Sequence, residues 1–175
     1  MKKLIFTAFV ALSVLVSCNQ INKKQALKKE NEKEHAAKTI AQIMETAEQN
    51  VGKEVYFEGI VKHVCAHSGR RVILLDETGK LSLRVEATGD IKGFNRELSG
   101  STIAVKGTLQ ENRLSEKFIN DWEVKVKAKE DAEEGGEHCA SEMTNINQMR
   151  EWMKKANRNF YSVYFVNGTS YEIVE

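Results

Sequence analysis

The chain has 175 residues, 41% of them hydrophobic, with 26 Lys and Arg residues against 25 Asp and Glu. This length fits one domain of ordinary size. The nearly balanced charge excludes the broad basic surface by which many proteins attract nucleic acid. The chain contains no proline, so Gly, Asn and Asp must form its tight turns.

The first residues have the pattern of a secretory signal peptide, expected over residues 1–17. Lys2 and Lys3 precede an apolar run at 4–16, which is too short to span a membrane comfortably. The run leads into Ser17 and Cys18, and it resembles the lipobox of bacterial lipoproteins, in which cleavage leaves the cysteine as the first residue. The resemblance implies that Cys18 carries acyl chains, which bind a membrane with roughly 0.8 kcal/mol per buried methylene.

Cleavage before Cys18 would remove two lysines and change the formal net charge from +1 to −1. We therefore expect a protein that is lipid-anchored to a bacterial envelope membrane, with its body in the periplasm. The alternatives are an uncleaved anchor or a secreted protein whose cysteine has no role. Residues 18–35 are almost wholly charged or polar, so we expect them to form a lipidated tether rather than to fold alone.

The pattern of the next segment, 36–128, predicts an N-terminal helix and a β-barrel. Apolar residues recur at helical spacing from Ala36 to Ala47. Alternating or apolar runs then predict four strands, at 54–64, 71–76, 81–87 and 101–110. Trp122, Val124 and Val126 indicate a fifth strand. Five strands, with a short helix or coil between the third and fourth, predict a mainly β (α+β) fold, a five-stranded OB-fold Greek-key barrel.

Residues 129–175 are expected to add a loop, a helix and a β-hairpin that pack on the barrel. The stretch 129–144 is acidic and contains glycine, which is typical of a loop. A helix is predicted from about Asn145 to Asn157. Asn167-Gly168 is a strong type I′ turn signal, so strands are expected on both sides of it.

Several stretches together resemble a group of small OB-fold lipoproteins of Gram-negative envelopes. They are "VGKEVYFEGIVKHVCAHSGRR", "LRVEA", "GFNRELSGS", "GGEHCASEM" and "NINQMREWM". The barrels of that group are similar to nucleic-acid-binding OB domains of the anticodon-binding type. The resemblance covers roughly residues 36–175 and the signal segment. It implies a fold and an anchor but no established activity, because fold alone does not determine function.

The stretch "HVCAHSGRR" is a candidate site. His63, Cys65 and His67 would share one face if the strand continues through them. With His138 and Cys139 from the later loop, they would suit Zn²⁺ or Cu⁺. Cys65 and Cys139 could instead form a disulfide, or stay unpaired thiols. We favour the disulfide over the metal site, and the metal site over unpaired thiols.

Three arginines form a second candidate site. Arg70 and Arg71 follow the first barrel strand, near the loop that borders the ligand groove of OB-folds, and Arg84 lies on the third strand. Such arginines could bind an anionic group through paired hydrogen bonds. The reading that we favour is that they solvate the barrel rim or pair with Asp76 or Glu86.

No combination of residues indicates catalysis, so we do not expect an enzyme. We expect a membrane-tethered OB-fold binding module of the bacterial envelope, with a protein, peptide or glycan as its partner. The first alternative is an envelope metal-binding protein that uses the His and Cys candidates. The second is single-stranded nucleic-acid binding, which the balanced charge and the expected compartment disfavour.

Overall fold

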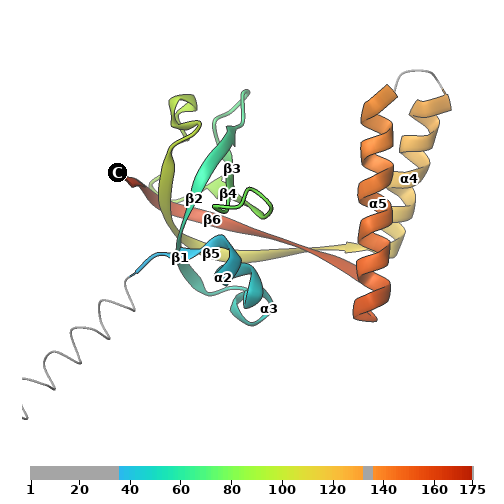
Figure 1. Ribbon diagram of the computed structural model, residues 1–175, viewed down its shortest axis with the longest axis horizontal. Coiled ribbons are helices and arrows are strands. Elements are labelled where there is room, and N and C mark those ends of the chain that lie inside the picture. Colours follow the sequence, from blue (N-terminus) through green and yellow to red (C-terminus); the bar gives the residue numbers. More distant parts are fainter. Residues whose placement is uncertain (1–35, 132–135, 175) are drawn as a thin grey trace, which may run out of the picture. The chain divides into compact units, whose positions relative to one another are not determined.

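Five strands close into a barrel in the computed structural model, which describes residues 36–131 and 136–174 and the side chains of these except 130–139 (Figure 1). They are β2 (Glu54–Val64), β3 (Arg71–Leu75), β4 (Ser82–Ala87), β5 (Thr102–Ser115) and β6 (Phe160–Val174). β2 pairs antiparallel with β3 and β5, β3 with β4, and β5 with β6, whereas β4 and β6 are parallel. This order is consistent with an OB-like barrel. The predicted fold class, mainly β with helices, is confirmed.

Short elements cover one side of the barrel. β1 (Lys38–Thr39) adds a sixth strand parallel to β2, and α2 (Ile40–Glu45) and α3 (Ala47–Asn50) follow it. A capping box starts α2, since the Thr39 hydroxyl accepts from Gln42 N and the Gln42 side chain accepts from Thr39 N. The predicted N-terminal helix is therefore present but divided. A 3-10 helix, η1 (Arg96–Leu98), lies in the link between β4 and β5.

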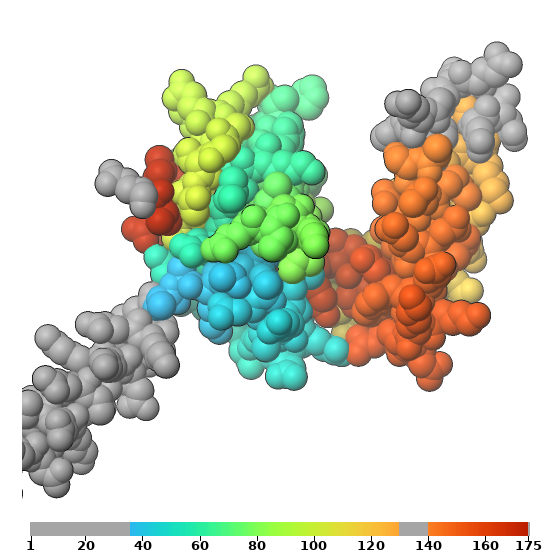
Figure 2. Space-filling model, in the orientation of Figure 1, coloured from blue at the N-terminus to red at the C-terminus, as the bar shows by residue number. Residues whose placement is uncertain are grey.

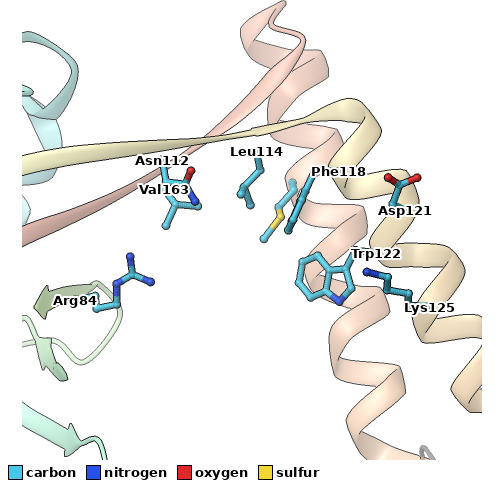
Figure 3. A pocket seen from close by; sticks show the side chains of 9 residues that line it. Arg84, Asn112, Leu114, Phe118, Asp121, Trp122, Lys125 and Val163 are labelled. Carbon is cyan, nitrogen blue, oxygen red and sulfur yellow. The ribbon is translucent and has the colours of Figure 1, made fainter. Parts of the chain in front are cut away.

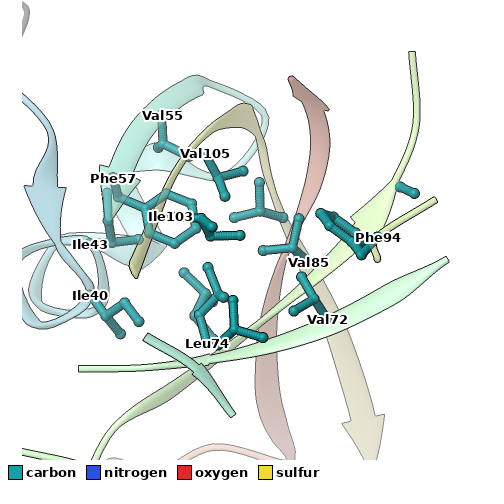
Figure 4. Packing of buried hydrophobic residues seen from close by; sticks show 14 of the residues in the cluster. Ile40, Ile43, Val55, Phe57, Val72, Leu74, Val85, Phe94, Ile103 and Val105 are labelled. Atoms are coloured by element: carbon teal, nitrogen blue, oxygen red, sulfur yellow. The ribbon is translucent and has the colours of Figure 1, made fainter. Parts of the chain in front are cut away.

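Alternation along the strands builds the barrel core. Every second residue of β3 and β4 is buried and apolar, so these side chains face the barrel interior (Figure 4). The core includes Phe57, Leu74, Leu83, Ile103 and Val105, each at most 1% exposed. α2 lies against β2 (Figure 2).

Gly59 lies where a helix meets a strand. A Cβ at Gly59 would stand 2.8 Å from Ile40 Cδ1 and 3.0 Å from Leu74 Cβ, so the absence of a side chain allows this approach. A glycine inside a strand often marks a bulge or a bend. The register of β2 with β3 instead shifts between Val61 and His63.

The predicted fifth strand is wrong. Trp122, Val124 and Val126 lie in α4 (Glu116–Asp131) and not in a strand. Ile119 and Val126 are buried, whereas Val124 is 67% exposed, which is the spacing of a helix and not of a strand. The fifth barrel strand is β6, which returns after the helices.

The predicted acidic loop and C-terminal hairpin are also wrong. α4 ends at Asp131, and α5 (Gly136–Ala156) begins inside the predicted loop 129–144 and includes the predicted C-terminal helix. Asn167-Gly168 forms no turn, because it lies inside the single strand β6. Gly168 pairs with Gly107 of β5 and with Ala87 of β4. The two glycines let the backbones approach where β5 has a register shift.

α4 and α5 form a helical pair with a core of its own. Ile119 and Val126 of α4 pack with Ile146 and Met153 of α5, and all four are buried. Residues 37–175 together form one compact unit that contains both cores. A chain that starts after Cys18 therefore keeps every contact described for this unit. The predicted signal peptide, the lipidation of Cys18 and the tether lie outside the described residues.

Arg150 joins the two helices through side-chain contacts. Its Nη2 donates to Asn120 Oδ1 at 2.7 Å and lies 2.5 Å from Glu123 Oε2. Glu123 also pairs with Lys127 at 2.7 Å. Hydrogen bonds from Arg150 and then Lys127 lower the pKa of Glu123 from 4.5 to about 2.

We expect Gly107→Ala to destabilise the barrel. An added Cβ would meet Val166 Cγ1 at 2.7 Å and Gly168 Cα at 2.8 Å, so the backbone of β6 would have to move. The free energy of unfolding should fall by about 1–3 kcal/mol, measured by urea denaturation of residues 19–175. Gly93→Ala is the matched control, since its Cβ would have only ordinary contacts from 3.6 Å outward. Equal stability of the two variants would contradict the close approach.

We expect the stability contributed by Glu123 to depend on pH. Because its pKa in the folded state lies below its ordinary value of 4.5, this contribution is present above pH 4.5 and is lost as the pH falls towards about 2. Glu123→Gln should lower the thermal midpoint at pH 7, and the difference from the natural protein should vanish near pH 2. Glu151→Gln, an exposed change on α5, is the control. A constant difference from pH 7 to pH 2 would count against the ion pair.

Candidate functional site

A row of five side chains crosses the outer face of the barrel. The strand register places His63 beside Ile73, Ile73 beside Arg84, Arg84 beside Phe165, and Phe165 beside Gln110. Each of these five residues has a neighbour in its own strand that points into the core, so the five side chains point outward. The row brings together side chains from all five barrel strands. Arg84 occupies its centre.

Arg84 is held in place by the Phe165 ring and by Glu86. Its guanidinium lies 4.7 Å from the centre of the Phe165 ring, a cation–π distance. Its Nε lies 3.2 Å from Glu86 Oε1, and Arg71 Nε donates to the same oxygen at 2.8 Å. Nε of Arg84 is buried, yet it makes no hydrogen bond to any residue that the structure describes. Stacking on Phe165 and the charge of Glu86 therefore orient Arg84.

A groove of about 440 Å³ opens beside Arg84 (Figure 3). β5 and β6 continue as a two-stranded ribbon beyond the barrel, and α4 follows β5 directly. Phe118, Trp122 and Lys125 lie at i, i+4 and i+7, so they share one face of α4, and all three line the groove. The other lining residues are Arg84, Asn112, Leu114, Asp121, Met149 and Val163.

The indole of Trp122 has a fixed position at the groove. Its Nε1 donates to Glu142 Oε1 on α5 at 3.2 Å, while the ring contacts the core of the helical pair. Phe118, one turn earlier, is 53% exposed. The groove therefore presents aromatic surface on the helix side.

The groove has a positive charge balance. Arg84 shares the single carboxylate Glu86 with Arg71, and Lys125 makes no ion pair among the described residues. The one acidic lining residue, Asp121, is bound to Lys117 at 2.7 Å. Apolar walls with two cations can bury an apolar group and pair with an anion.

The three predicted arginines have different environments. Arg84 lines the groove, whereas Arg71 pairs with Glu86, one of the two partners that the sequence suggested. Arg70 is exposed and does not line the groove. The α4 side of the groove was not predicted from the sequence, because Trp122 was assigned to a strand. The helical spacing of Phe118, Trp122 and Lys125 was the available signal.

The stretch "HVCAHSGRR" forms the corner between β2 and β3. β2 ends at Val64, and a turn follows in which Gly69 N donates to the Cys65 carbonyl at 2.9 Å. Gly69 has a φ of +62°, which favours glycine. The turn is attached to the link before β5, since Phe94 N donates to the Gly69 carbonyl at 2.7 Å. The corner is thus a structural junction.

The strand does not continue through Cys65 and His67, so the condition for their sharing one face with His63 is not met. Within residues 36–131 and 136–174, no three or more His, Cys, Asp or Glu side chains form a group that could hold a metal. The side chains of His138 and Cys139 lie outside the described residues. The disulfide and the five-residue metal site therefore remain predictions.

Cys65 is half-buried and has a stabilised thiolate form. Hydrogen bonds from the backbone N–H groups of Ser68 and His67 lower the pKa of the Cys65 thiol, and the Ser68 hydroxyl, 3.8 Å from Sγ, lowers it further. The charge of Arg71 contributes least. This environment favours reaction with electrophiles at a pH below the ordinary range of thiols.

No model of a known protein family matches the chain, and no curated protein matches it. Among the described residues, no helix is long and apolar enough to cross a membrane.

We expect Ser68→Ala to slow the alkylation of Cys65. Loss of the hydroxyl removes one of the hydrogen bonds that stabilise the thiolate. In residues 19–175 with Cys139→Ser, where Cys65 is the only cysteine, the pH midpoint of iodoacetamide labelling should rise. Ser82→Ala, at a serine far from Cys65 in the chain, is the control. An unchanged midpoint would show that the hydroxyl has no influence on the thiol.

Proposed function

We propose that this protein is a binding module with an OB-like barrel, tethered to a bacterial envelope membrane by lipid on Cys18, with its body in the periplasm. The groove between the barrel and α4 is the observation that carries the binding role. The lipobox-like segment that ends at Cys18 supports the tether.

The composition of the groove supports recognition of a ligand. Arg84 is oriented by Phe165 and Glu86, and Trp122 is oriented by Glu142, so both sides are arranged before a ligand arrives. A site arranged in advance loses less conformational freedom on binding. The groove also lies on the outer barrel face, which OB-like barrels commonly use for ligands.

The charged segment 18–35 supports a body held apart from the lipid. It contains many Lys and Glu residues and few apolar ones, so it has little tendency to bury itself in a membrane. Acyl chains on Cys18 would supply the membrane affinity, and the groove would remain open to ligands in the periplasm.

We expect the natural chain to incorporate radiolabelled palmitate when it is produced in a Gram-negative host. Cys18→Ala should abolish the label because the acceptor thiol is lost. Cys65→Ala, which removes another cysteine of the same chain, should leave the label unchanged. The measurement is autoradiography of the purified protein after gel electrophoresis. Absence of label from the natural chain would refute the lipid tether but would not bear on ligand binding by the groove.

A further inference from the structure

We infer that the groove binds a small amphipathic anion, meaning an apolar or aromatic body that carries one carboxylate or sulfonate group. The inference deepens the proposed binding role and rests on it. It does not depend on the lipid anchor, because every residue involved lies within the compact unit 37–175.

The apolar half of the site comes from the ribbon and the helices. Leu114 and Val163 form the ribbon side, and Phe118, Trp122 and Met149 form the helix side. Figure 3 shows Phe118 and Trp122 on α4 and Leu114 and Val163 on the ribbon. Phe118 remains 53% exposed next to these partly buried neighbours. A ligand with an apolar body would remove this surface from water.

The charged half comes from two cations on different walls. Arg84 projects from β4, its side chain is 31% exposed, and its Nε pairs with Glu86 Oε1 at 3.2 Å. Lys125 projects from α4, one turn after Trp122. Asp121 is occupied by Lys117. An anionic group would therefore meet a cation at either end of the groove and no unpaired carboxylate of its lining.

The size of the groove favours a small ligand. Its volume of about 440 Å³ falls in the range of about 300–1,000 Å³ that is usual for small-molecule sites. A single-stranded nucleic acid is the competing anionic ligand, but it needs a longer basic path with several stacking aromatic residues. The two cations and the adjoining aromatic pair of this groove fit one anionic head and one apolar body.

Trp122 provides a fluorescent reporter inside the groove. The chain has two tryptophans, and Trp152 packs against Tyr161 at 5.2 Å between ring centres, away from the groove lining. Trp152→Phe in residues 19–175 leaves Trp122 as the single donor for energy transfer. Transfer to a bound probe would then report on the groove.

The test uses two probes of similar shape and different charge. We expect 8-anilinonaphthalene-1-sulfonate, an aromatic anion, to bind saturably with energy transfer from Trp122. Neutral N-phenyl-1-naphthylamine should bind more weakly. Arg84→Met or Lys125→Met, whichever removes the cation beside the sulfonate, should raise the Kd of the anionic probe about tenfold and change that of the neutral probe much less. The matched controls are Arg70→Met and Lys129→Met, which remove cations outside the groove.

Saturable binding of both probes with equal Kd would overturn the anion preference but keep the groove as a binding site. Failure of both probes to bind would also remove the proposed binding role of the groove. Effects no larger than those of the controls, or displacement of the anionic probe by a dodecathymidylate, would overturn the inference. Circular dichroism checks folding, and the exposed Lys125→Met keeps the test valid if Arg84→Met unfolds.

Discussion

The double pairing of β6 is the constraint on which the rest of the structure depends. β6 is parallel to β4 on one side and antiparallel to β5 on the other, so it closes the barrel. A Cβ at Gly107 would clash with the backbone of β6, and a Cβ at Gly168 would clash with the Val85 side chain of β4. The closure holds the Phe165 ring beside Arg84 and fixes the direction of the ribbon. A strand from the very end of the chain thus builds both the barrel and the groove.

Much of the fold could be predicted from local patterns, and the errors have one physical origin. Alternation identified β2 and the β3–β4 hairpin because each buries one face. Trp122, Val124 and Val126 also alternate, but so short a run is compatible with a helix as well as a strand. Only the structure, in which Val124 is exposed, distinguishes the helix from a strand. Asn167-Gly168 indicated a turn because both residues tolerate unusual backbone angles. The barrel instead uses the small size of Gly168, because an added Cβ would lie 2.7 Å from Cγ1 of Val85, 83 positions earlier in the chain.

In the candidate site, likewise, one side could be predicted from the local sequence and the other depends on residues distant in the chain. Arg84 could be found from its place on a strand of an OB-like barrel, and its pairing through Glu86 was among the alternatives. The wall of the groove opposite Arg84 could not be found from the sequence. Lys125 lies at the groove only because the β5–β6 ribbon has this length and α4 begins where β5 ends. The shared face of His63, Cys65 and His67 was not predicted correctly, because β2 ends at Val64 and a turn follows.

The last pair of the β5–β6 ribbon, Ser115 with Phe160, has a consequence for how this architecture can vary. These two residues are paired on adjacent strands, and the chain between them forms the helical pair. A tight turn could therefore join the strands directly and leave a plain barrel. Helices of another length or composition could equally be inserted at the same junction. The helices that form one wall of the groove can thus be exchanged, while the barrel that supports them stays the same.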